Sequence, residues 1–233
     1  MIVPGYPRSF APHFTQLVPI LRALSIALLA ACALPQEQLA GTPPDLKIEV
    51  LIRGLDTPWA VDFAPDGRIF ITERPGRIRI FGGGRLLSEP WMTLEVAAVS
   101  EAGLMGLALD PQFAQNRFVY VAYTYRAPNG RLQNRLVRLR EDQKSGKGSP
   151  DKVLIDNVAG ANNHDGGRVK FGPDGKIYWT TGDAQTTRFA QDLRSLNGKI
   201  LRLIAGGSIP ADNPFANSYV YSYGHRNPQG LAW

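Results

Sequence analysis

A polar run at residues 163–168 has the composition of a proton-transfer site. It reads Asn163-His164-Asp165-Gly166-Gly167-Arg168. Histidine is the side chain most readily poised to accept a proton near neutral pH, and paired glycines let the backbone turn sharply. We therefore expect His164 to be a catalytic base, with Asn163 and Asp165 beside it in a pocket. The alternative is a structural histidine.

A second polar run lies at residues 224–230, Gly-His-Arg-Asn-Pro-Gln-Gly. Arg226 offers a planar fork of donors that suits carboxylate oxygens, and Asn227 adds a donor and an acceptor. We expect these two side chains to contact a ligand and expect His225 and Gln229 to be structural or supporting. The alternative is that the whole run makes hydrogen bonds within the fold.

Two acids complete the candidate set. Glu101, in the run Glu-Ala-Gly-Leu-Met-Gly, either lines the pocket or caps a neighbouring structural unit. Asp183, in Thr181-Gly182-Asp183, is interpreted as a turn residue or a link between units. The sequence contains no nucleophile elbow, no phosphate-binding loop and no dinucleotide-binding glycine motif after a strand.

The segments that carry these residues form a repeat. Residues 63–72 (FAPDGRIFIT) match residues 171–180 (FGPDGKIYWT), and each copy predicts a strand, a Pro-Asp-Gly turn and a second strand. A looser copy covers residues 107–123, and a fourth copy begins at residue 230. The copies lie roughly 46 to 62 residues apart, which with about four strands per copy is typical of β-propeller blades. A β-sandwich is the alternative.

The position of the polar residues within the repeat predicts that they converge. His164 and Arg226 each lie seven residues before the corresponding point of their copies, and Glu101 lies eight before. The innermost strand of every blade begins on the same face of a propeller, so residues just before these strands gather around one axis. Asp183 returns to the same face at the end of the second strand.

Composition and the N-terminus indicate export. Arg8 and Arg22 precede the apolar stretch 23–31, which is too short to span a bilayer but fits a secretory signal at residues 1–31. Residues 29–32 (Leu-Ala-Ala-Cys) resemble a lipoprotein processing site with Cys32 as the lipidated residue; the alternative is ordinary cleavage. A linker at 32–45 would then lead to a partial propeller domain at 46–233, in a periplasmic or membrane-anchored protein.

Charge and cysteine content exclude other classes of protein. Cys32 is the only cysteine, so the chain cannot form an intrachain disulfide. Loss of residues 1–31 removes two arginines and no acid, which lowers the formal charge from +6 to +4. The basic residues alternate with apolar ones instead of clustering, so we do not expect a nucleic-acid partner.

These runs resemble the soluble glucose/sorbosone dehydrogenase family, also called aldose sugar dehydrogenases. The matching segments are residues 57–63, 101–113, 162–175, 196–202 and 224–231, in the family's order and at compatible spacing. The resemblance implies an all-β, six-bladed propeller, of which this chain would supply about three blades and the start of a fourth. It also implies two cofactors, pyrroloquinoline quinone (PQQ) and Ca²⁺.

The resemblance further implies a mechanism. His164 removes the proton of the anomeric hydroxyl of an aldose, the C1 hydride passes to the C5 atom of the quinone, and the sugar becomes a lactone. Arg226 and calcium polarise the quinone carbonyl, Asn227 helps to hold it, and an external electron acceptor reoxidises the cofactor. The family's calcium-binding segment lies downstream of residue 233, so we expect no metal ligand here and little turnover by this chain alone.

Two other functions remain open at this point. A calcium-dependent propeller lactonase would need several carboxylates and asparagines around one metal, and Asn163, Asp165 and Asp183 are available. A non-catalytic binding propeller is the second possibility, although such a protein has no need of the histidine and arginine.

Overall fold

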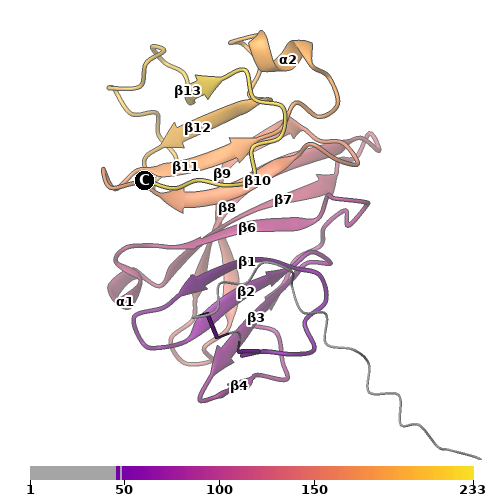
Figure 1. The fold of residues 1–233 in the computed structure, drawn as a ribbon. Coiled ribbons are helices and arrows are strands. Elements are labelled where there is room, and N and C mark those ends of the chain that lie inside the picture. The colour runs from indigo at the N-terminus through magenta and orange to yellow at the C-terminus, as the bar shows by residue number, and fades with distance from the viewer. Residues whose placement is uncertain (1–45, 48) are drawn as a thin grey trace, which may run out of the picture. The chain divides into compact units, whose positions relative to one another are not determined.

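The repeat corresponds to three antiparallel sheets that follow one another along the chain (Figure 1). The structure is a computed structural model, and it describes residues 46, 47 and 49–233. The predicted signal peptide at 1–31, Cys32 and the linker at 32–45 lie outside the described residues. Glu49–Trp233 form one compact unit.

Each sheet is a meander in which consecutive strands pair, except that the fifth strand of the first sheet pairs with the third. The first blade contains β1 (Pro58–Phe63), β2 (Ile69–Glu73), β3 (Arg77–Gly82), β4 (Arg85–Leu86) and β5 (Met92–Thr93). The second contains β6 (Leu104–Leu109), β7 (Phe118–Arg126), β8 (Leu132–Glu141) and β9 (Gly148–Ala159). The third contains β10 (Gly166–Phe171), β11 (Ile177–Thr181), β12 (Lys199–Leu203) and β13 (Val220–Tyr223). Two single-turn helices, α1 (Phe113–Asn116) and α2 (Arg188–Gln191), lie in connections.

Both Pro-Asp-Gly turns predicted from the repeat are confirmed. They join β1 to β2 and β10 to β11, and their glycines, Gly67 and Gly175, have φ angles of 85° and 70°. Each glycine N–H donates to the carbonyl three residues earlier, that of Ala64 or Gly172, which is the hydrogen bond of a β-turn. The looser copy differs, because α1 occupies the connection between β6 and β7.

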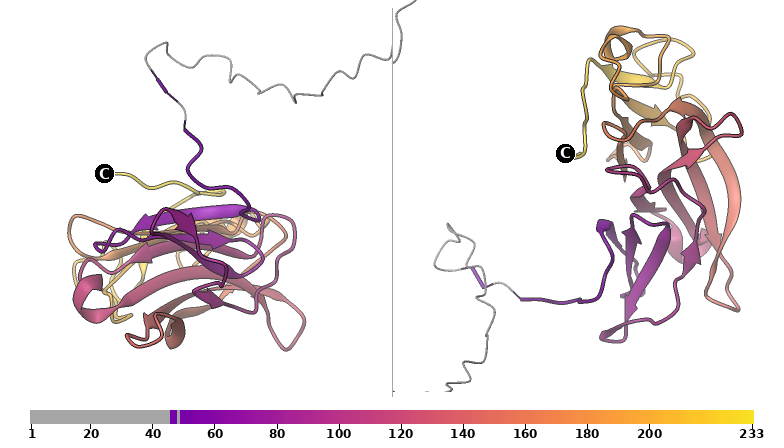
Figure 2. Two further views of the ribbon diagram at one scale, coloured as in Figure 1. Left: turned by 90° about the horizontal axis from the view of Figure 1, so that it is seen from below. Right: turned by 90° about the vertical axis from the view of Figure 1, so that its right-hand side faces the viewer.

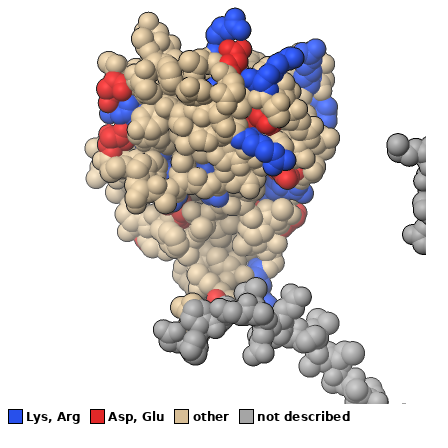
Figure 3. Space-filling model, turned by 45° about the horizontal axis from the view of Figure 1, so that its top comes forward, with Lys and Arg blue, Asp and Glu red and all other residues tan. Residues whose placement is uncertain are grey.

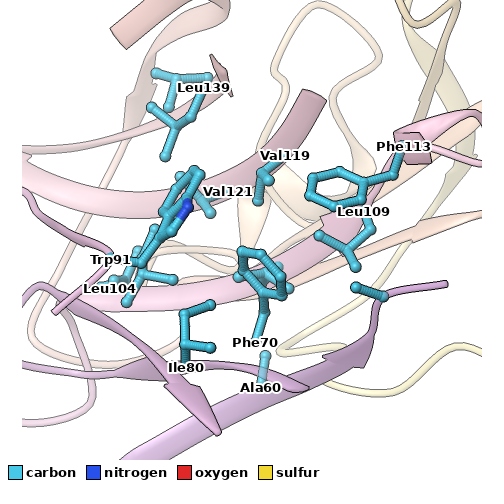
Figure 4. Packing of buried hydrophobic residues seen from close by; sticks show 14 of the residues in the cluster. Ala60, Phe70, Ile80, Trp91, Leu104, Leu109, Phe113, Val119, Val121 and Leu139 are labelled. Atoms are coloured by element: carbon cyan, nitrogen blue, oxygen red, sulfur yellow. The ribbon is translucent and has the colours of Figure 1, made fainter. Parts of the chain in front are cut away.

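The second blade is apolar on both faces because it is packed on both sides. Alternate residues of a strand point to opposite faces, and in β7 Val119 and Val121 pack with the first blade, whereas Tyr120 and Ala122 pack with the third. Figure 4 shows the first of these two cores, where the rings of Phe70, Trp91 and Phe113 meet edge to face. The sheets therefore stack in chain order, as the side view in Figure 2 shows.

The first strands of the three blades lie next to one another, since β6 contacts both β1 and β10. Each of these strands also shows a shift in register near its start: between Pro58 and Ala60, between Leu104 and Leu107, and between Gly166 and Val169. Such irregularities bend a strand and redirect its side chains, and they are frequent beside functional sites. The predicted convergence therefore has a structural basis: the loops before these strands meet at one edge of the stack.

The third blade is followed by a segment without regular secondary structure. The repeat predicts a strand beginning at Gly230, but residues 224–233 contain none. A strand needs a neighbour for its backbone hydrogen bonds, and among the described residues no strand pairs with this segment. Trp233 instead packs its ring edge-on against Tyr178, with 5.1 Å between the ring centres.

Charged side chains are scattered on the surface in Figure 3, where Lys and Arg alternate with acidic and uncharged residues. Many basic groups belong to ion pairs between strands, such as Arg135 with Asp156 and Arg138 with Asp151. In the part of the chain that the structure describes, no helix has the length and apolar character needed to cross a bilayer.

Candidate functional site

His164 lies in the loop between β9 and β10, and its backbone is in the left-handed region, with φ of 61°. This conformation costs a residue other than glycine about 1–2 kcal/mol. Gly166 and Gly167 follow with φ angles of 71° and 100°, so the chain turns into β10 as the sequence predicts. Residues held in such conformations cluster at functional sites, where the surrounding structure keeps them in place.

The imidazole of His164 is paired with a buried carboxylate. Its Nδ1 lies 2.9 Å from Oδ1 of Asp183, and the two side chains are 15% and 2% exposed. The same oxygen accepts the N–H of Gln185 at 2.9 Å. A carboxylate only accepts hydrogen bonds, so in the neutral ring the proton lies on Nδ1 and Nε2 keeps its lone pair.

A close backbone approach brings these two residues together. The carbonyl of His164 lies against Gly182, where an added Cβ atom would stand 1.8 Å from that oxygen. No side chain fits there, so position 182 requires glycine. The carbonyl also accepts the N–H of Ala184 at 3.1 Å. The segment after β11 therefore supports His164 through both its backbone and its ring.

Glu101 connects the preceding blade to the loop that carries His164. Its N–H donates to the carbonyl of Asn162 at 2.9 Å, and its Oε2 accepts the N–H of His164 at 3.4 Å. The residue is exposed at the rim of the site. The structure thus brings Glu101 to His164 across the boundary between two blades.

Asn163 and Gln185 border the same place. The Nε2 of Gln185 donates to Oδ1 of Asn163 in a short hydrogen bond. Ala184 and Gln185 both have positive φ, 49° and 60°, so the segment opposite His164 is also held in an unusual conformation. Asn163 is partly exposed, and Gln185 is exposed.

The two predicted ligand residues lie in the segment after β13. The carbonyl of Arg226 accepts the N–H of Asp183 at 2.8 Å, which fixes its backbone beside the carboxylate that holds His164. Its side chain is exposed, and within residues 46, 47 and 49–233 its guanidinium makes no hydrogen bond or ion pair. Oδ1 of Asn227 accepts the N–H of Gly166 at 3.0 Å, which leaves its amide NH₂ to donate.

His225 and Gln229 make contacts within the fold. Nε2 of His225 lies 2.8 Å from Oγ of Ser222, and its N–H donates to the carbonyl of Gly198. Burial, followed by the nearby charge of Lys199, lowers the pKa of His225, so this ring is neutral near pH 7. The carbonyl of Gln229 accepts Nε of Arg168 at 2.9 Å.

Asp165 has a different setting from the one we expected of a pocket residue. The structure buries it to 2% exposure, and its Oδ1 accepts Nδ2 of Asn134 at 2.7 Å and the N–H of Ala161 at 3.0 Å. Its Oδ2 is buried without a partner. Burial raises the pKa of Asp165 to about 6, against the smaller opposing effect of the hydrogen bond from Asn134.

This pKa predicts a pH-dependent stability. Between pH 4 and 6 the folded chain keeps a proton on Asp165 that the unfolded chain has lost, so the contribution of this group to stability falls as the pH rises. A shift of about two units corresponds to at most about 3 kcal/mol. In Asp165→Asn this dependence should disappear. Urea unfolding at pH 4, 5, 6 and 7 measures it, and a difference between wild type and variant that stays constant over this range would contradict the expectation.

Among the described residues, no group of three His, Cys, Asp or Glu side chains is arranged to hold a metal ion. The quinone implied by the resemblance is an anionic, oxygen-rich molecule. The exposed guanidinium of Arg226 and the free NH₂ of Asn227 fit such a group.

Asp183, expected from the sequence to be a turn residue or a link between units, has a further role that was not expected. Asp183 does cap the turn at Gln185, but it also holds the ring of His164. One signal was available: the return strand β11 ends at the edge where β10 begins, as the pairing of Gly166 with Thr181 shows. This pairing predicts that Asp183, two positions beyond Thr181, lies near His164.

Comparison with known proteins identifies the family. The model of the Glucose / Sorbosone dehydrogenase family matches residues 55–233. Aldose sugar dehydrogenase YliI of Escherichia coli is 35% identical, over 93% of this chain and 57% of its own length. Quinoprotein glucose dehydrogenase B of Acinetobacter calcoaceticus is 31% identical, over 95% and 54%.

Solved structures agree with this assignment and with the propeller fold. The PQQ-bound aldose sugar dehydrogenase of Streptomyces coelicolor superposes with a TM-score of 0.74 at 34% identity, covering 80% of this chain and 56% of that one. The chain spans about half the length of the curated relatives that it matches. Its three sheets have the β-propeller fold of these neighbours, and the chain is a member of the glucose/sorbosone dehydrogenase family.

Proposed function

We propose that this chain forms the base-bearing half of a PQQ-dependent dehydrogenase that oxidises C1 of aldose sugars to the lactone. One observation carries the proposal: the 2.9 Å hydrogen bond from Nδ1 of His164 to the buried carboxylate of Asp183, in a chain that matches the model of the Glucose / Sorbosone dehydrogenase family. That bond leaves Nε2 of His164 to accept a proton. Glu101 and Gln185 contact the same loop from two other segments of the chain.

His164 takes the proton of the C1 hydroxyl of the sugar at Nε2, while Asp183 holds the opposite nitrogen and stabilises the ring as it gains charge. PQQ, when bound, accepts the hydride that leaves C1. Loss of one proton and one hydride turns the hemiacetal carbon into the lactone carbonyl. Glu101 and Asn163 lie at the rim, where they would contact the sugar hydroxyls.

Arg226 and Asn227 are proposed as cofactor contacts. The guanidinium of Arg226 would donate to an oxygen of the quinone or of one of its carboxylates, and it would polarise the carbonyl there. The amide NH₂ of Asn227 would add a second donor, while its oxygen keeps the start of β10 in place. Calcium stays a proposal based on the family resemblance, with its ligands beyond the residues described.

The location and remaining partners follow as proposals. The sequence of residues 1–32 supports export, with the protein either free in the periplasm or anchored through a lipid on Cys32. Repeated turnover would require an external electron acceptor.

The deciding experiment measures dye reduction with several aldoses. The protein should contain this chain continued to the length of its relatives and should be supplied with PQQ and Ca²⁺. We expect reduction that depends on both the aldose and PQQ. Absence of PQQ-dependent reduction would refute the proposal, and hydrolysis of a lactone without PQQ would indicate a hydrolase instead.

A further inference from the structure

A chain of buried hydrogen bonds connects the second blade to the loop that carries His164. Oγ1 of Thr124 on β7 donates to Oδ1 of Asn134 on β8 at 2.6 Å. Nδ2 of Asn134 donates in turn to Oδ1 of Asp165 at 2.7 Å. The same carboxyl oxygen accepts the N–H of Ala161, at the start of the loop. Thr124 and Asn134 are fully buried, so water does not compete for these bonds.

These hydrogen bonds come from a different blade from the one that supplies the ring partner of His164. Asp183 and Ala184, on the third blade, hold the ring and the carbonyl of His164 by hydrogen bonds. Asp165 is the next residue along the chain, and it is fastened to the second blade. His164 therefore lies between two supports, each from a different sheet.

The backbone of His164 needs such supports. Its φ of 61° is unfavourable for a histidine and persists only while its neighbours hold it. Without the side chain of Asp165, the loop would lose its hydrogen bond to Asn134 and the bond that closes residue 161 onto residue 165. The hydrogen bonds of Glu101 to residues 162 and 164 would then be left to hold the loop on this side. The loop could then relax toward an ordinary conformation, which would turn the imidazole away from Asp183.

Only one oxygen of Asp165 takes part. Oδ1 accepts both hydrogen bonds, whereas Oδ2 is buried without a partner. This position therefore requires an acceptor oxygen at the place of Oδ1, and it does not require a negative charge. Asparagine supplies that oxygen, and alanine does not.

We propose that Asp165 is a positioning residue for the catalytic base, whose Oδ1, held by Asn134, fixes the 161–165 loop so that the ring of His164 stays on Asp183. This role differs from the substrate contact expected from the sequence. Its functional consequence rests on the proposed function, but the geometric claim about His164 and Asp183 does not.

The first test reads the hydrogen bond itself. In NMR spectra of the full chain, the proton on Nδ1 of His164 should give a downfield signal, assigned by its loss in His164→Asn. The signal should be absent in Asp165→Ala and present in Asp165→Asn. Persistence of the signal in Asp165→Ala would overturn the proposal, as would its loss in Asp165→Asn.

A second variant covers the case in which Asp165→Ala does not fold. Asn134→Ala removes the donor from the second blade and should also abolish the signal, whereas Lys170→Ala, at an exposed position on β10, should leave it unchanged. If the two residues act through their mutual bond, the double variant Asp165→Ala/Asn134→Ala should behave like the worse single variant. A signal that survives in Asn134→Ala would also refute the link.

Kinetic measurements then test whether the position of the His164 ring affects turnover. In the longer, PQQ-loaded protein we expect kcat to fall about 10- to 100-fold in Asp165→Ala, within the range of a misplaced base, and to return to within a few-fold of wild type in Asp165→Asn. A wild-type protein without PQQ-dependent activity but with the expected NMR pattern would refute the proposed function alone. Full activity in Asp165→Ala would refute the inference alone.

Discussion

His164→Asn should lower kcat for aldose oxidation by about 10³-fold, in the middle of the range for loss of a positioned general base. The amide of asparagine can still donate to Asp183, so the local structure keeps its partner. What is lost is the basic Nε2 atom. Steady-state dye reduction measures the effect.

The control for this variant is His225→Asn. His225 belongs to the neighbouring polar run, but its ring contacts Ser222 within the fold. Its replacement should leave kcat within a few-fold of wild type. Equal losses in the two variants would mean that the effect comes from destabilised structure, and an active His164→Asn would exclude His164 as the base.

Asp183→Asn should reduce kcat by at least about 10²-fold, with an upper bound near the 10⁴-fold loss known for the corresponding change in a catalytic triad. Asparagine keeps the size of the side chain, but it carries no charge. If its NH₂ faces Nδ1, the ring must take the other tautomer and Nε2 becomes protonated. If its oxygen faces Nδ1, the carboxylate that stabilises the charged imidazole is gone.

Asp192→Asn is the matched control. Asp192 lies in the same connection between β11 and β12, but it pairs with the exposed Arg194. Its neutralisation should not change kcat. KM for the sugar should also change little in Asp183→Asn, because Asp183 is buried behind His164 and does not face the rim. A large rise in KM with kcat intact would contradict a role in proton transfer.

Much of the fold could be predicted because the determining signals are local. The Pro-Asp-Gly turns, the short apolar runs and their recurrence require only neighbouring residues, and they correspond to β1–β2 and β10–β11 as observed. The convergence of the polar runs also followed from the repeat, and Glu101, His164 and Arg226 do lie at one edge: the carboxylate of Glu101 accepts the N–H of His164, and the carbonyl of Arg226 accepts the N–H of Asp183, the ring partner of His164.

The side-chain partners could not be predicted in the same way. Asp183 looks like a turn residue in the sequence, and its carboxylate does accept a turn hydrogen bond from Gln185 in addition to holding His164. Asp165 looks like part of the pocket because it adjoins His164, yet the left-handed backbone at His164 directs the two side chains to different blades. Whether a loop residue faces the pocket or the core depends on such backbone angles. The residue types make some angles more favourable than others but do not determine them.

The sequence alone determined that this chain is a β-repeat protein with a histidine and an arginine at equivalent points of successive units, because those properties depend on turn chemistry and spacing. The tertiary structure decided that Asp183 holds His164, that Gly182 must be glycine and that Asn134 reaches Asp165. These are contacts between residues far apart in the chain, and they depend on strand register, on the irregularities in the first strands and on how the sheets stack. Packing sets all three, and no local pattern encodes them.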